Sequence, residues 1–248
     1  MVLLLGNSDD ALVNAVLHIL NARGVPVQQI SEPELFASVP FAFEQQARTF
    51  TASLHLNNLE TQLQDLSGVL VRLPRSWSPP PDFDLQDQVF IYHESNAAWF
   101  ALISGLRCSM VNRPSLAWWV HDLTYPETIT HQLATRLALS LAASPLPPAG
   151  LGRLFPTRPP VSPHSASFYA VDGALIPCSA DHLPFAPQIP ASRLEAWQKE
   201  NGLRFCRLDF VCDNHVPKLT SVDVYPLLDD EPASVVDKVA LAITEALS

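Results

Sequence analysis

Lysine is scarce in this sequence of 248 residues, because only Lys199, Lys218 and Lys238 occur and all three lie in its last fifth. Fifteen basic residues stand against 25 acidic ones, and the formal charge of -10 argues against nucleic acid or an anionic membrane as a partner. No stretch approaches the ~18 uninterrupted apolar residues of a membrane span. The start, MVLLLGNSDD, lacks the basic region of a signal peptide. We therefore expect a cytoplasmic location and no membrane partner.

Glycine and cysteine are also few. Eight glycines against 23 prolines indicate many stiffened loops. The one glycine that follows the first apolar run, Gly6, falls far short of a dinucleotide or P-loop fingerprint. The four cysteines show no Cys-x-x-Cys spacing, so we expect buried thiols rather than a disulfide framework. One alternative stays open, a zinc site formed by Cys178, His182, Cys206 and His215.

The first 30 residues predict a strand, a helix and a second strand. The apolar run Val2 to Leu5 is followed by an amphipathic stretch that Ser8 can cap and Gly24 can close. A second strand is expected at Val25 to Ile30. Such a β-α-β unit is right-handed and makes a parallel pair of strands.

The following residues extend this pattern up to a breaker-rich segment. The continuous apolar run Gly68 to Leu73 is typical of a buried parallel strand. Long helices are expected at Gln86 to Leu106 and at Thr128 to Ala142. The segment Ser144 to Pro148 contains three prolines and marks a boundary. We therefore predict an α/β protein, with a parallel-sheet domain over residues 1–148 and a smaller antiparallel α+β domain over residues 149–248.

Residues 203–226 predict a long β-hairpin in the smaller domain, since two apolar runs flank the turn-forming triplet at 213–215. Strand alternation places Asp209 in the first strand, and Asp223 lies near the end of the second. Two carboxylates on paired strands repel unless a cation or a basic residue lies between them. The pair predicts a Mg²⁺ site; the alternative is a hairpin whose acids face solvent or pair with arginine.

These features resemble ATP-grasp ligases. The strand Arg-Leu-Asp-Phe-Val and the ending Asp223-Val224-Tyr225-Pro226 are similar to the magnesium hairpin of that family, in which the second strand usually ends as Glu-Val-Asn-Pro. In the first half, a strand ending in Arg-x-Pro at Arg72, a long helix with Glu94 and the run Val111 to Pro114 resemble the preliminary domain of the family. The resemblance is greatest to ligases that modify ribosomal peptides or add amino acids to proteins.

The resemblance also implies what the chain has lost. ATP-grasp ligases clamp the nucleotide between two subdomains, and the first of these contributes a phosphate-binding lysine. That subdomain should lie between Pro148 and Ser167, where fewer than 20 residues are available, and no lysine occurs from Met1 to Gln198. Phosphoryl transfer depends on charge neutralisation, so we expect a degenerate ATP-grasp-like protein without cofactors that acts as a binding or accessory protein in peptide or amino-acid modification.

Two alternatives stay open. One is an active ATP-dependent carboxylate-amine ligase that uses Mg²⁺ and ATP and carries arginines in place of lysines. The other is a different small-molecule enzyme working in the cleft between the domains, with His121 or His131 as acid or base. Under the leading interpretation the metal residues Asp209 and Asp223 are vestigial.

Four arginines are the candidates for ligand binding: Arg72, Arg75, Arg113 and Arg207. Ligands of open α/β sheets bind beyond the carboxyl ends of the strands, where Arg72 and Arg75 are expected. Arginines gathered on one crevice of an acidic protein favour an anionic ligand such as a peptide carboxylate. We therefore expect a peptide or a small anionic ligand, with a protein from the same pathway as a further partner.

Overall fold

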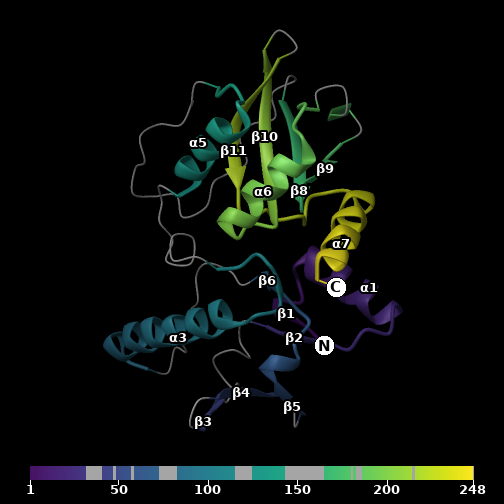
Figure 1. The fold of residues 1–248 in the computed structure, drawn as a ribbon. Helices are drawn as coiled ribbons and strands as arrows, with labels where there is room; N and C mark the ends of the chain where they lie inside the picture. Colours follow the sequence, from purple (N-terminus) through teal and green to yellow (C-terminus); the bar gives the residue numbers. More distant parts are fainter. Residues whose placement is uncertain are drawn as a thin grey trace. The chain divides into compact units, whose positions relative to one another are not determined.

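The computed structural model describes most of the chain (Figure 1). The described residues are 1–31, 41–46, 49–56, 59–72, 83–114, 125–142, 165–179, 181–182, 186–213 and 216–247. Among the helices in these ranges, none combines the length and the apolar character that a membrane span requires.

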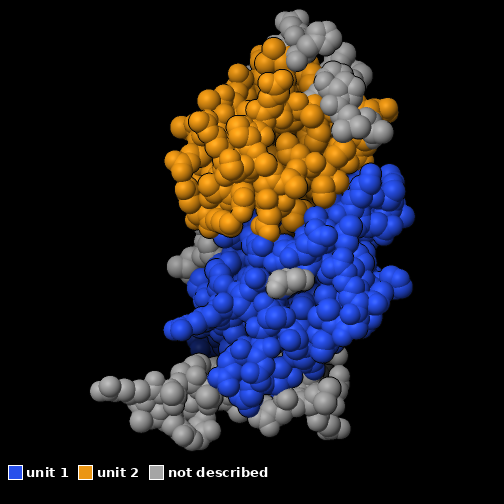
Figure 2. Space-filling view, turned by 45° about the vertical axis from the view of Figure 1, so that its right-hand side comes forward, with its two compact units in different colours: residues 1–122, 202–204, 227–248 blue, residues 123–201, 205–226 orange. Residues whose placement is uncertain are grey.

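The chain forms two compact units, coloured blue and orange in Figure 2. Unit 1 comprises residues 1–122, 202–204 and 227–248, and unit 2 comprises residues 123–201 and 205–226. This division differs from the predicted boundary after residue 148. The reason is packing: helix α5 (Tyr125–Leu137) lies against a strand of unit 2, while helix α7 (Ala233–Leu247) buries its apolar face in unit 1.

Unit 1 is built on a four-stranded parallel sheet, as the apolar runs predict. Its strands lie in the order β2-β1-β6-β7. Their bounds are β1 (Val2–Gly6), β2 (Val27–Ile30), β6 (Gly68–Arg72) and β7 (Ser109–Val111). All residues of β1 and β6 are buried, which explains why these strands are continuous apolar runs without alternation.

Helix α1 (Ala11–Ala22) connects the first two strands and packs against α7. The N-cap is Asp10, whose side chain accepts from the backbone N–H groups of Leu12 and Val13, so the prediction of Ser8 as the cap is wrong. Asp10 lies two residues further on and reaches two of the four backbone N–H groups that the first turn leaves without an intrahelical partner. Gly24 has a φ of +66° and closes the helix as predicted.

The other described elements of unit 1 are one long helix, a small antiparallel sheet and a short 3-10 turn. Helix α3 (Leu85–Gly105) buries Trp99 and Ile103 near its C-terminal end. The small sheet has the order β3-β4-β5. The bounds are β3 (Phe41–Gln46), β4 (Thr49–Leu56), β5 (Leu59–Gln62) and η1 (Leu63–Asp65).

Unit 2 contains a four-stranded antiparallel sheet with the order β11-β10-β8-β9. The strands are β8 (Ser165–Val171), β9 (Ala174–Pro177), β10 (Phe205–Asp213) and β11 (Val216–Asp223). Strands β10 and β11 form the predicted hairpin, and two residues of its turn, 214 and 215, lie outside the described residues. A parallel sheet in unit 1 and an antiparallel sheet in unit 2 confirm the predicted α/β fold class.

Helices α5 and α6 (Ala191–Asn201) cover one face of this sheet (Figure 1). Gln198 of α6 is fully buried, donates to the carbonyl of Ala170 at 3.2 Å and accepts from the N–H of Gly173 at 2.6 Å. Its side-chain nitrogen also lies 4.0 Å from Cys206 Sγ. Cys206, and with it the even-numbered side chains at the start of β10, therefore faces the helices. Burial in this position raises the pKa of the Cys206 thiol to about 12.

Candidate functional site

The face of the unit 2 sheet that points away from α6 carries a cluster of polar residues on the hairpin. Arg207 pairs in register with Asp223, and Asp209 pairs with Ser221 across β11 and with Ser167 across β8. Paired residues of neighbouring strands share a face of the sheet. These five residues, here called the hairpin cluster, therefore come together on the face where the sequence predicts the metal site.

Asp209 is the centre of the hairpin cluster and is only 6% exposed. Its Oδ1 accepts from the Ser167 hydroxyl at 2.7 Å, and its Oδ2 accepts from the Ser221 hydroxyl at 2.9 Å. Arg207 is the third partner of this carboxylate, because its Nη2 donates to Oδ2 at 3.3 Å and its Nε lies 3.1 Å from Oδ1. Both carboxylate oxygens thus have partners within the chain.

Arg207 supplies the positive charge of the hairpin cluster. Burial lowers the pKa of its guanidinium, but the negative charges of Asp209 and Asp223 outweigh burial and hold this pKa above its ordinary value. Asp223 accepts from the backbone N–H of Tyr225 at 2.9 Å. A guanidinium thus supplies a positive charge beside the two acids and forms an ion pair with Asp209, which is the arginine-paired alternative considered from the sequence. Within the described residues, no three His, Cys, Asp or Glu side chains form a group that could hold a metal ion.

The other predicted arginines have structural partners where the structure describes them. Arg72 is 3% exposed, and its Nε and Nη2 lie 2.9 and 2.8 Å from Oδ2 of Asp10. Arg113 donates to three backbone carbonyls at the end of α3 and just beyond it. Arg75 lies outside the described residues. The convergence of these arginines on one crevice stays a prediction, since Arg72 and Arg113 belong to unit 1 and Arg207 to unit 2.

The cysteine and histidine candidates that the structure describes do not share one side of the sheet, although the Cys178 N–H donates at 3.0 Å to the carbonyl of Ser167, near His182. His182 Nδ1 lies 3.2 Å from both the backbone N and O of Ser167 in β8. Cys206 faces the opposite side, toward α6, while His215 and His121 lie outside the described residues. His131 is exposed on α5, where it lines a groove.

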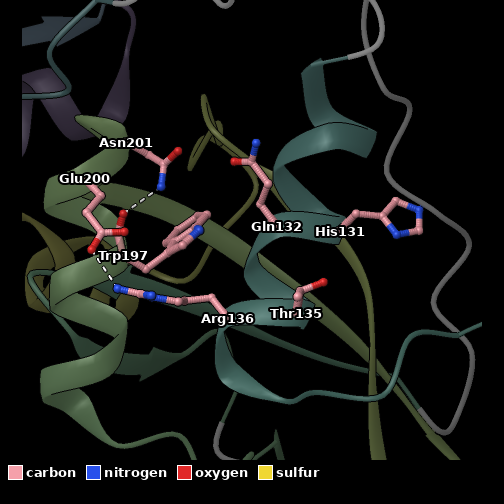
Figure 3. Close-up of a pocket in the computed structure, with 7 residues that line it drawn as sticks. All are labelled: His131, Gln132, Thr135, Arg136, Trp197, Glu200 and Asn201. Atoms are coloured by element: carbon pink, nitrogen blue, oxygen red, sulfur yellow. Dashed lines mark hydrogen bonds and ion pairs between the residues drawn. The ribbon is translucent and has the colours of Figure 1, made fainter.

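This groove between α5 and α6 has a volume of about 610 Å³ (Figure 3). Helix α5 contributes His131, Gln132, Thr135 and Arg136, and α6 contributes Trp197, Glu200 and Asn201. An ion pair of 2.8 Å joins Arg136 to Glu200, and Asn201 donates to the carbonyl of Trp197 at 2.8 Å. We name it the α5–α6 groove. Sequence reasoning found only His131, because the other residues come together only when the two helices pack.

Trp197 is the buried member of this groove. It is 2% exposed, and Figure 3 shows its indole between the helices with the nitrogen on the side of α5. No acceptor among the described residues forms a hydrogen bond with Nε1. A buried indole N–H normally has a partner, because the group can only donate.

No protein-family model matches the sequence, and no curated protein matches it. Solved structures do match over the whole chain. The macrocyclase MdnC from Microcystis aeruginosa, bound with precursor peptide MdnA, has a TM-score of 0.71 and 13% identity, with 100% of this chain and 99% of that chain covered. The macrocyclase MdnB from the same organism has a TM-score of 0.66 and 12% identity, with 100% and 99% covered.

A third similar structure is the RiPP-associated ATP-grasp ligase of Chryseobacterium gregarium in complex with ADP and with a leader and core peptide. It has a TM-score of 0.66 and 10% identity, with 99% of this chain and 96% of that chain covered. This chain therefore has an ATP-grasp-like fold, of the kind found in peptide-modifying ligases. The resemblance inferred from the hairpin and from the order of the N-terminal elements is confirmed at the level of the fold.

Proposed function

We propose that this chain is a degenerate ATP-grasp-like protein that has lost nucleotide-dependent ligation and serves as a peptide-binding accessory protein in peptide or amino-acid modification. The observation that carries the proposal is the pairing of Asp209 with Arg207 in the hairpin cluster. Two neighbouring carboxylates need a cation between them, and here a guanidinium that stays protonated at every physiological pH supplies it.

Conversion of this cluster into a magnesium site would be costly. Mg²⁺ requires near-octahedral oxygen ligands and gives up its water reluctantly. To reach Asp209, the ion would displace Arg207 and two serine hydroxyls from a carboxylate that is only 6% exposed. Breaking a buried ion pair leaves an uncompensated charge, so the present arrangement favours the guanidinium.

The distribution of lysines supports the same conclusion. ATP-dependent ligation needs positive groups on the phosphates, and the sequence has no lysine from Met1 to Gln198. The first one, Lys199, lies on the exposed side of α6 in an ion pair of 2.6 Å with Glu195. An arginine does not simply replace a buried phosphate-binding lysine.

Peptide is the ligand class that the structural matches support. MdnC was solved bound with its precursor peptide, and the Chryseobacterium gregarium ligase in complex with a leader and core peptide. A chain that keeps the fold over its whole length while losing the charged groups for ATP retains the part of the protein that can recognise a peptide. Peptide recognition without ligation is the activity of an accessory protein.

The test of lost nucleotide binding is a thermal melt of the full chain with millimolar Mg-ATP, Mg²⁺ alone, and ATP with EDTA. A ligand at 100 times its dissociation constant adds about 2.7 kcal/mol. For a chain of this size that corresponds to roughly 5–11 °C. We expect no such rise. A rise with Mg-ATP that disappears in the Asp209→Asn/Asp223→Asn variant would show a working metal hairpin and support the active ligase.

The peptide half of the proposal is tested by calorimetry without nucleotide. We expect a saturable heat when the uncharged tripeptide acetyl-Gly-Gln-Gly-amide is titrated into the chain in EDTA. Peptide binding that requires Mg-ATP would contradict the proposal, because it would couple recognition to the nucleotide.

A further inference from the structure

We propose that the α5–α6 groove binds an extended peptide segment, and that a backbone carbonyl of this segment accepts a hydrogen bond from Trp197 Nε1. The inference rests on the proposed function for the choice of a peptide, and it deepens that function by giving the peptide a site. The site lies on the helix side of the unit 2 sheet, whereas the hairpin cluster lies on the other face.

The first argument is the unsatisfied donor. Trp197 is 2% exposed, and no acceptor among the described residues pairs with its Nε1. A buried donor without an acceptor has lost its water without replacement, so a ligand that supplies an acceptor there restores the missing interaction. Most buried polar groups have a partner, which makes this nitrogen a specific point of attachment.

The second argument is access. The nitrogen faces α5 across the groove, and the residues of α5 that line this side, Gln132 and Thr135, are exposed (Figure 3). Exposed side chains change rotamer within nanoseconds. The α5 side of the groove can therefore rearrange beside Trp197 without movement of either helix.

The third argument is the chemistry of the lining. Arg136 and Glu200 neutralise each other in an ion pair whose side chains are 57% and 56% exposed, so the groove has no excess positive charge to select a phosphate or a carboxylate. Gln132 offers both an amide donor and an amide acceptor, which is the pattern that a peptide backbone needs. The acceptor that fits Nε1 is thus a neutral carbonyl.

The fourth argument is size and form. A volume of about 610 Å³ lies within the roughly 300–1,000 Å³ range of ligand sites. Six of its seven lining residues are exposed or partly exposed, so this is an open groove rather than a closed cavity. An open groove admits a chain that continues at both ends, as an extended peptide does.

The experiment uses the full chain labelled with ¹⁵N, because the five tryptophans each give an indole N–H signal. Loss of one signal in Trp197→Phe identifies that of Trp197. We expect acetyl-Gly-Gln-Gly-amide to shift this signal saturably and to leave that of Trp99 unchanged. Acetate, which offers a carboxylate without a peptide, should cause no shift.

Matched variants separate recognition from stability. Trp197→Phe should weaken binding about two- to tenfold by calorimetry, the value of one hydrogen bond, whereas Trp99→Phe in unit 1 should not. Gln132→Ala changes an exposed residue of α5 and should weaken binding without lowering the melting temperature. Gln86→Ala, at an exposed position of α3, is its control.

The contrary outcomes are distinct. Calorimetric binding of the tripeptide that leaves the Trp197 indole signal unmoved would overturn the groove and retain the proposed function. No binding of the tripeptide by either method would overturn both. An equal shift with acetate would show that the site recognises anions and would overturn the assignment of a neutral carbonyl.

Discussion

Replacement of Arg207 by methionine removes the positive charge of the hairpin cluster while keeping most of the side-chain volume. Asp209 and Asp223 then lose the guanidinium charge beside them, and Asp209 is only 6% exposed. Breaking a buried ion pair by removing one partner costs about 3–5 kcal/mol. At about 2–4 °C per kcal/mol, we expect the melting temperature to fall by roughly 6–20 °C. The same substitution at exposed Arg193 is the control, with an expected change within about 0.5 kcal/mol.

A double-mutant cycle measures how much of this cost belongs to the pair. Asp209→Asn removes the charge but keeps the shape, and loss of hydrogen bonds to a charged group should cost about 1.5–3 kcal/mol. In the double variant neither charge of the pair remains, so its cost should be smaller than the sum of the two single costs by about 0.5–3 kcal/mol. Urea unfolding followed by circular dichroism gives all four free energies.

Two results would refute this reasoning. Additive costs of the two single substitutions would mean that Arg207 and Asp209 do not stabilise each other. Stabilisation of the wild-type chain by Mg²⁺ would mean that the guanidinium does not fill the place of the cation. Mg²⁺-dependent stabilisation that appears only in Arg207→Met would support the reasoning, because removal of the guanidinium leaves two carboxylates for the ion.

Three further predictions concern other parts of the fold. Asp10→Ala should lower the free energy of unfolding by about 3–5 kcal/mol in urea, because α1 loses its cap and buried Arg72 loses its carboxylate. Gly173→Ala should lower it by more than about 1 kcal/mol, since a Cβ would lie 2.5 Å from the Ala191 carbonyl oxygen at a φ of +83°; an unchanged urea midpoint would contradict this. Burial raises the pKa of the Cys206 thiol from an ordinary 9.0 to about 12. The folded state therefore keeps this proton to a higher pH than the unfolded state does, so the stability that the protonated thiol contributes is complete below pH 9 and is lost as the pH rises toward 12. We expect Cys206→Ala to lose less stability than the wild type between pH 9 and 10.5 in urea, and native Cys206 to resist a thiol reagent at pH 8.

The elements that the sequence predicts best are those whose patterns depend on burial of a whole face. The apolar run at β6 and the alternation along β10 both indicate the strands that the structure contains. The helix expected at Gln86 to Leu106 is α3, shifted by one residue. Helix α7 was not predicted, although its buried residues recur at helical spacing; what the sequence does not show is that they pack on α1, at the other end of the described chain.

The site residues show why partners are harder to predict than elements. Arg207 and Asp209 are two residues apart on one face of a strand, so the sequence predicts that they lie close together. The sequence does not show whether the arginine binds a ligand or pairs with the acid, because both cases place it at the same position of the strand. Arg72 and Asp10 are 62 residues apart, and their pairing depends on how β6 lies beside β1. The sequence does not reveal the role of the Trp197 indole for a similar reason. A tryptophan on the buried side of a helix gives the same sequence pattern whether or not its indole N–H has an acceptor.

The division of the chain bears on its synthesis. Residues 227–248 belong to unit 1, so the chain passes from one unit to the other after residues 122, 201, 204 and 226. On the ribosome, α1 emerges long before α7, and until then the buried residues of α1 lack the helix that packs against them. Unit 2 is synthesised completely in that interval and can fold first. A nascent chain interrupted near residue 226 would expose the apolar face of α1 and become a substrate for chaperones or proteases.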